Sequence, residues 1–149
     1  MKQFTFRLER LLQLREAAEK ERARQLGEAL REEEERREAL RASQARLAEA
    51  RGQLSSPSSG LTQAGTLRNL ELSVEMLAGQ ARSLEDHHQK SLERVEEERT
   101  RFEQARVARR VIERLREHRK EAWGVEANRV EQVLNDEAGQ RAHGSREQP

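Results

Sequence analysis

The sequence predicts an all-α protein: two long helices forming an antiparallel coiled-coil hairpin with a protruding C-terminal helix end. Ala, Glu, Lys, Leu and Arg make up 91 of the 149 residues, well above the roughly 50% typical of long helices and coiled coils. Charged residues (38%) outnumber hydrophobic ones (34%), and only 3% are aromatic. Because β-branched residues and tyrosine are scarce, strands and an enclosed catalytic cleft are excluded.

The first helix is expected over residues 5–54. Leucines recur there at a seven-residue spacing that two glutamates interrupt, and further apolar residues lie beside this column. The column comprises Leu12, Glu19, Leu26, Glu33, Leu40, Leu47 and Leu54, and the residues beside it are Leu8, Ala23, Ala29, Leu30 and Ala50. A stripe this narrow is typical of a coiled-coil seam.

A Ser-, Gly- and Pro-containing segment centred on Pro57–Gly60 predicts a loop over residues 55–65. A second helix is expected over residues 66–138, where apolar residues recur at alternating spacings of three and four. That register runs through Leu67, Leu70, Val74, Leu77, Ala81, Leu84, His88, Ser91, Val95, Glu98, Phe102, Ala105, Ile112, Trp123, Val130 and Val133. Residues 1–138 therefore form a single predicted domain, followed by a tail over 139–149 that lacks periodicity and is expected to be disordered.

A short loop makes the two helices antiparallel neighbours. Folding the chain at Pro57–Gly60 is expected to place residues 5–10 opposite 107–112 and to leave about 25 residues of the second helix without a partner. A competing apolar register begins after Ala105 and comprises Ala108, Val111, Leu115, Ala122 and Val125. It predicts either a change of register or a second contact surface.

The sequence offers no catalytic, cofactor or metal site. The adjacent pair His87 and His88 would point about 100° apart on a helix, which does not suit two ligands of one metal. Glutamates 32–35 fit a solvated charge run, and the chain has no cysteine. The N-terminus does not fit a signal peptide, and the chain has no apolar run long enough to span a membrane.

The segment Arg106–Lys120 holds seven basic residues against two acidic ones. Nucleic acid, a membrane surface and solvent are alternatives for such a helix, but no aromatic residue interleaves with the arginines, and the net charge of the chain is only +1. Val107, Val111 and Leu115 lie off the main seam and are flanked by arginines, which favours a protein partner. Trp123 fits either seam packing or an interface anchor.

The opening F-x-F-R-L-E-R-L-L-Q-L-R-E (Phe4 to Glu16), the two long helices, the Ser/Gly-rich interruption and the Arg-rich second helix resemble the FliJ family. The resemblance covers about residues 4–138, and injectisome stalk proteins share the architecture. It implies a non-enzymatic, cytoplasmic component of the flagellar type III export apparatus, at the inner face of the cell membrane. Such a protein would resemble a rotary-ATPase stalk, insert into and stimulate the hexameric export ATPase, contact the membrane export gate and escort export chaperones.

Carried onto this chain, the resemblance assigns both binding sites. The ATPase site would comprise Arg7, Leu8, Arg10, Leu11, Leu14, Arg106, Arg109, Arg110, Arg116 and Trp123. The export-gate site would comprise Leu72 and Met76, although a larger aromatic side chain would be expected at Leu72. The alternative function is that of a structural coiled coil that associates with itself or with another helical protein and has no link to an ATPase.

Overall fold

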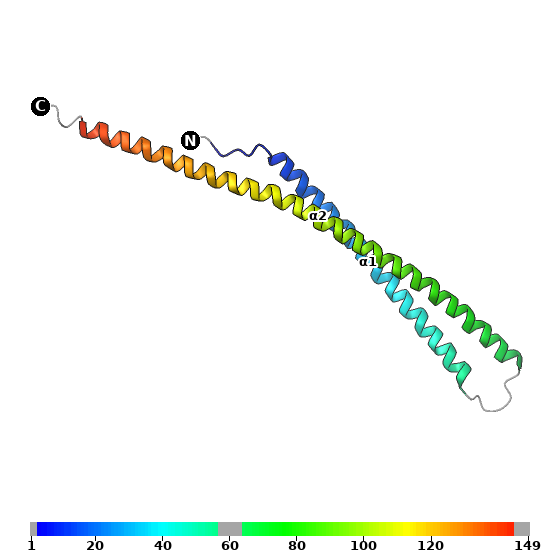
Figure 1. The fold of residues 1–149 in the computed structure, drawn as a ribbon. Coiled ribbons are helices and arrows are strands. Elements are labelled where there is room, and N and C mark those ends of the chain that lie inside the picture. The colour runs from blue at the N-terminus through cyan, green and yellow to red at the C-terminus, as the bar shows by residue number, and fades with distance from the viewer. Residues whose placement is uncertain (1–2, 57–63, 145–149) are drawn as a thin grey trace. The chain divides into compact units, whose positions relative to one another are not determined.

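The computed structural model describes residues 3–56 and 64–144, which form two helices and no strand. Helix α1 spans Glu9–Ser55 and helix α2 spans Ala64–Gly144 (Figure 1). Glu19 of α1 contacts Arg109 of α2, whereas the later residue Glu33 contacts the earlier residue His88. The helices therefore run antiparallel, and the predicted all-α hairpin is confirmed. The expected loop around Pro57–Gly60 lies outside the described residues.

The chain divides into two compact units, and each contains parts of both helices. We call residues 1–19 and 105–149 the terminal unit, and residues 20–104 the hairpin unit.

The hairpin unit has a thin core that contains several small and polar side chains. Its most buried side chains are Ala29, Ser43, Leu47, Ala81, Ser91, Val95 and Glu98. The leucine column of α1 is confirmed as inward-facing, but Ala23 and Leu30 are exposed, so their predicted seam positions were wrong. The second inward column lies at Ala29, Ser43 and Ala50. Leu30 follows Ala29 directly, so its side chain is rotated by about 100° around the helix and out of the interface.

Charged side chains join the helices of the hairpin unit where apolar ones are missing. The ring Nε2 of His88 lies 2.8 Å from Oε1 of Glu33, and both side chains are largely buried. Arg94 also pairs with Glu32. Because a polar seam residue accepts few partners, the His88–Glu33 contact favours this pairing of α1 with α2 over a shifted one.

Glu98 is a buried carboxylate at a seam position of the hairpin unit. Its Oε1 accepts a hydrogen bond of 2.8 Å from Arg101, whereas Oε2 is buried without a partner among the described residues. Glu98→Met is therefore expected to raise the free energy of unfolding by about 1–2 kcal/mol, since an unsatisfied polar atom is removed. Thermal and urea unfolding measure the change, with the exposed Glu97→Met as the control. A destabilised Glu98→Met protein would contradict this account.

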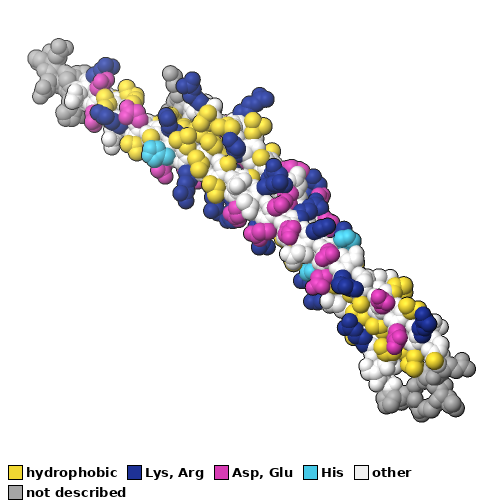
Figure 2. Space-filling view, turned by 45° about the vertical axis from the view of Figure 1, so that its right-hand side comes forward, with side chains coloured by type: hydrophobic (Ala, Val, Ile, Leu, Met, Phe, Trp, Pro, Cys, Tyr) yellow, Lys and Arg dark blue, Asp and Glu magenta, His cyan; other side chains and the backbone are white. Residues whose placement is uncertain are grey.

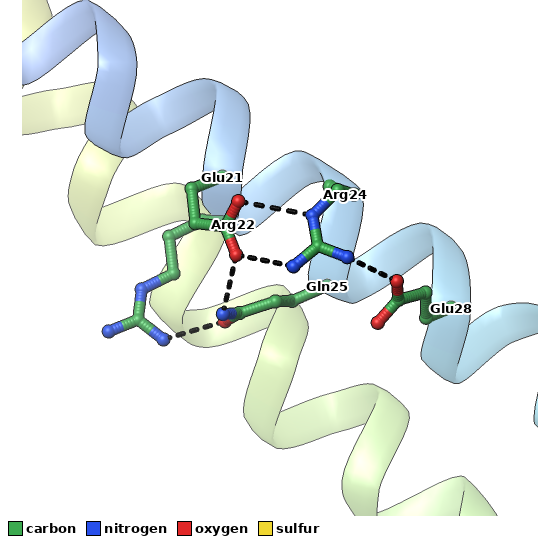
Figure 3. Close-up of polar contacts among 5 residues, drawn as sticks. All are labelled: Glu21, Arg22, Arg24, Gln25 and Glu28. Carbon is green, nitrogen blue, oxygen red and sulfur yellow. Dashed lines mark hydrogen bonds and ion pairs between the residues drawn. The ribbon is translucent and has the colours of Figure 1, made fainter.

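The outer surface of α1 carries ion pairs within one helix (Figure 3). Arg24 donates hydrogen bonds to Glu21 and Glu28, and Gln25 connects Glu21 with Arg22. The hydrogen bond from Arg24 is the main reason why the pKa of Glu21 lies below its ordinary value of 4.5. A lowered pKa means that this contact stabilises the helix above pH 4.5 and is lost as the pH falls through the lowered pKa.

Helix α2 begins two residues before its predicted start and continues to Gly144. The expected disordered tail from 139 was therefore wrong for residues 139–144. The physical reason is that Ala138, Gln140, Arg141 and Ala142 are strong helix formers, which offset the cost of about 1 kcal/mol for Gly139. None of the described helices has the length and apolar character needed to cross a membrane.

Candidate protein-binding site

The terminal unit begins with a short non-helical segment over residues 3–8. The backbone N–H of Glu9 donates to the carbonyl of Phe6 at 3.1 Å, and the N–H of Leu12 donates to the carbonyl of Leu8 at 2.9 Å. The predicted start of the helix at residue 5 was therefore wrong for residues 5–8. The aromatic rings explain the difference, because Phe4 and Phe6 are partly buried and the ring of Phe4 lies beside α2.

The terminal unit also has a different pairing from the predicted one. Arg116 contacts Glu9 at 2.9 Å, and the rings of Phe4 and Trp123 lie 6.0 Å apart with an interplanar angle of 54°. The expectation that residues 5–10 face 107–112 was therefore wrong. The shift is a property of the helix pairing and not of the non-helical segment, because Glu9 and Arg116 both lie in helices and Glu19 with Arg109 shows a similar offset. Trp123 lies beside this segment, and among the described residues no part of α1 or of the N-terminal segment is paired with α2 beyond it.

Ion pairs hold α1 against α2 in the terminal unit. Arg109 is largely buried and binds both Glu19 of α1 and Glu113 of α2. The hydrogen bond to Glu19 is the main reason why the pKa of Arg109 is raised above its ordinary value. Two of the arginines predicted to bind the ATPase, Arg109 and Arg116, therefore have partners inside the chain.

Other side chains of the terminal unit form an exposed apolar and basic surface. Val107, Val111 and Leu115 lie one helical turn apart on α2, and Val111 is 60% exposed. Arg110 and Arg114 are exposed beside them. We call these five residues the α2 outer patch. Figure 2 shows hydrophobic side chains gathered in this unit, with basic side chains among them.

The remaining residues predicted for the ATPase site also lie in the terminal unit. Arg7, Leu8, Arg10 and Leu14 are exposed, whereas Leu11 and Arg106 are partly buried. Trp123 is 39% exposed. The structure thus brings the predicted residues into one unit, on more than one face of it.

Sequence reasoning missed an exposed apolar strip beyond Trp123. An open groove there is lined by Trp123, Glu126, Ala127, Val130, Glu131, Leu134 and Asn135. Val130 and Val133 continue the predicted apolar register into the part of the second helix that was expected to have no partner, and both are about half exposed there. The apolar residues of the predicted overhang, read together, were the signal that could have identified this strip.

The two residues predicted for the export gate lie in the hairpin unit. Leu72 and Met76 are one turn apart on α2 and are 56% and 61% exposed. They share a face that points away from the seam residues Leu70, Val74 and Leu77, which are partly buried.

The Phe4–Trp123 contact gives a direct test of how the N-terminal segment packs. Trp123 is the only tryptophan in the chain, so the fluorescence reports the surroundings of this one side chain. Phe4→Ala is expected to shift the emission to longer wavelength, because water replaces a ring contact that contributes about 0.5–1.5 kcal/mol. Leu14→Ala, an exposed change elsewhere in the unit, is the control. Unchanged emission in Phe4→Ala would show that the segment does not pack there in solution.

Comparison with known proteins gives one match. The sequence model of the family described as Flagellar FliJ protein matches residues 3–148, nearly the whole chain. No curated protein and no solved structure matches the chain. The chain therefore belongs to the FliJ family and is a flagellar export-related protein.

Proposed function

We propose that this protein is a stalk-like adaptor of the flagellar type III export apparatus. Its terminal unit inserts into the hexameric export ATPase and stimulates it, and its hairpin unit contacts the membrane export gate. The α2 outer patch is the observation that carries this proposal, since exposed valine and leucine ringed by arginine are typical of a protein interface. Membership of the FliJ family supports the choice of partner.

The contacts inside the terminal unit divide the predicted ATPase residues into two roles. Arg7, Leu8, Arg10, Leu14 and Arg110 are exposed and would contact the ATPase directly. Leu11, Arg106 and Trp123 would add apolar and basic contacts at the edge of this surface. Arg109 and Arg116 would act indirectly, because they bind Glu19 and Glu9 and so hold α1 in place.

The proposed gate contact would bring the protein to the inner face of the cell membrane, and none of the helices described by the structure is suited to span it. Leu72 and Met76 form a small exposed apolar pair suited to a shallow apolar pocket. Leucine has less contact area than the aromatic residue expected at that position, so Met76 would carry a larger share of the binding. Export chaperones are a further proposed partner of the same apparatus.

The test is light scattering of the purified chain with the cognate export ATPase and a non-hydrolysable nucleotide. The proposal predicts that the ATPase shifts to a hexamer carrying a single copy of this protein. An ATPase whose mass and activity do not respond to the chain would overturn the proposal. The chain would then be better described as a structural coiled coil that associates with itself or with another helical protein.

A further inference from the structure

The distal part of α2 changes sign of charge abruptly. Residues 106–120 hold seven basic and two acidic side chains, whereas residues 121–140 hold five acidic and one basic. The basic half comprises Arg106, Arg109, Arg110, Arg114, Arg116, Arg119 and Lys120, and the acidic half comprises Glu121, Glu126, Glu131, Asp136 and Glu137. Both halves are helical and belong to the terminal unit. The net charge of the whole chain is only +1, so it does not reveal that the two halves carry opposite charges.

The same stretch carries one exposed apolar face that crosses both halves. It comprises Val107, Val111, Leu115, Val125 and Val133, of which Val125 is 70% exposed. At 3.6 residues per turn these side chains fall within an arc of about 80°. Their mean direction lies about 140° from that of Arg109, Arg116 and Trp123, through which α2 meets α1. We call this the distal face, and residues 3–19 leave it exposed.

We propose that the distal face binds a second copy of this chain in antiparallel orientation. An antiparallel copy places its acidic half over the basic half of the first chain and its basic half over the acidic half. The two-fold axis then lies near residues 120 and 121, and the same apolar face is used twice. A parallel copy in register would place like charges together, which is unfavourable. The charge pattern therefore favours a self-complementary dimer.

This inference goes beyond the proposed function, because it concerns the chain without its ATPase. The distal face includes Val107, Val111 and Leu115 of the α2 outer patch, so a dimer would cover the surface proposed for the ATPase. Self-association and ATPase binding would then exclude each other, and the dimer would be the form held before assembly. The tests below use the purified chain alone, so they succeed or fail independently of any ATPase result.

Sedimentation velocity over a range of concentrations tests the dimer. We expect a reversible monomer–dimer equilibrium whose dimer fraction falls as salt rises, because the Debye length shortens from about 10 Å at 0.1 M to about 3 Å at 1 M. Val125→Asp is expected to weaken dimerisation at least about tenfold, since it puts a charge into the apolar face. Asn135→Asp adds the same charge on another side of the helix and is the control. A strict monomer at all concentrations, or a dimer indifferent to Val125→Asp, would overturn the proposal.

Spin labels test the orientation, because the chain has no native cysteine. Single labels at Lys120→Cys and Asn135→Cys are measured in the dimer by pulsed electron paramagnetic resonance. An antiparallel pair centred on residue 120 keeps the labels at 120 at the same level and separates those at 135 by about 45 Å along the axis. Equal distances at both positions would show a parallel pair and overturn the proposal. In that case the distal face would remain available to a different protein.

Discussion

Reversing the charges of Arg110 and Arg114 together is expected to raise the concentration of this protein that half-stimulates the export ATPase by at least about tenfold. Both side chains are exposed beside Val111 in the α2 outer patch. Arginines at the centre of an interface often contribute more than 1 kcal/mol each, and a reversed charge adds repulsion where attraction is lost. The measurement is ATP hydrolysis by the cognate ATPase over a titration of Arg110→Glu/Arg114→Glu.

The control for this experiment is Arg31→Glu/Arg41→Glu, which makes the same change of charge on exposed positions of α1 in the hairpin unit. It is expected to stimulate the ATPase like the unaltered chain. Arg109 is less suitable than Arg110 and Arg114 for the charge-reversal test. Its replacement would break the interhelical ion pair with Glu19 and would weaken the terminal unit itself. Equal stimulation by both double variants would remove the outer patch from the proposed ATPase site.

Periodicity predicted the fold because it reports which side chains face a partner helix. The column through Leu12 and Leu47 and the register through Ala81 and Val95 are buried as expected. Periodicity does not report where a helix begins, because the non-helical residues 5–8 are of types that also occur in helices. Nor does it separate positions one residue apart in a narrow stripe, which is why Leu30 was placed inward.

The candidate site was harder to predict, because the sequence alone does not show which arginines form ion pairs within the chain and which are exposed. Only the pairing of α1 with α2 shows that Arg109 meets Glu19 and Arg116 meets Glu9, whereas Arg110 is exposed. If the predicted pairing of α1 with α2 is wrong by several residues, an arginine that forms an interhelical ion pair is mistaken for an exposed one. The family resemblance identified the partner class, and the side-chain contacts distinguish exposed candidates from those that stabilise the unit.

Replacing both Leu72 and Met76 with glutamate is expected to weaken binding to the membrane export gate by at least about a hundredfold. Burying each of these side chains at an interface would contribute about 1.5–3 kcal/mol, and every 1.4 kcal/mol changes an affinity tenfold. Both are more than half exposed in the hairpin unit, so the substitutions should leave the thermal unfolding of the chain nearly unchanged. Titration calorimetry with the cytoplasmic part of the gate protein measures the affinity.

The matched control is Thr66→Glu/Ser73→Glu, which adds two carboxylates to exposed positions of the same stretch of α2. These positions lie about 60–120° around the helix from Leu72 and Met76, so an effect of charge alone would appear in both variants. Loss of binding only in Leu72→Glu/Met76→Glu would assign the contact to this apolar pair. Restoring an aromatic ring with Leu72→Phe should strengthen binding if the pocket on the gate accepts a larger side chain. Equal binding by all three variants would mean that the gate contacts another part of the chain, and the link between ATPase and gate would then have to run through a different surface.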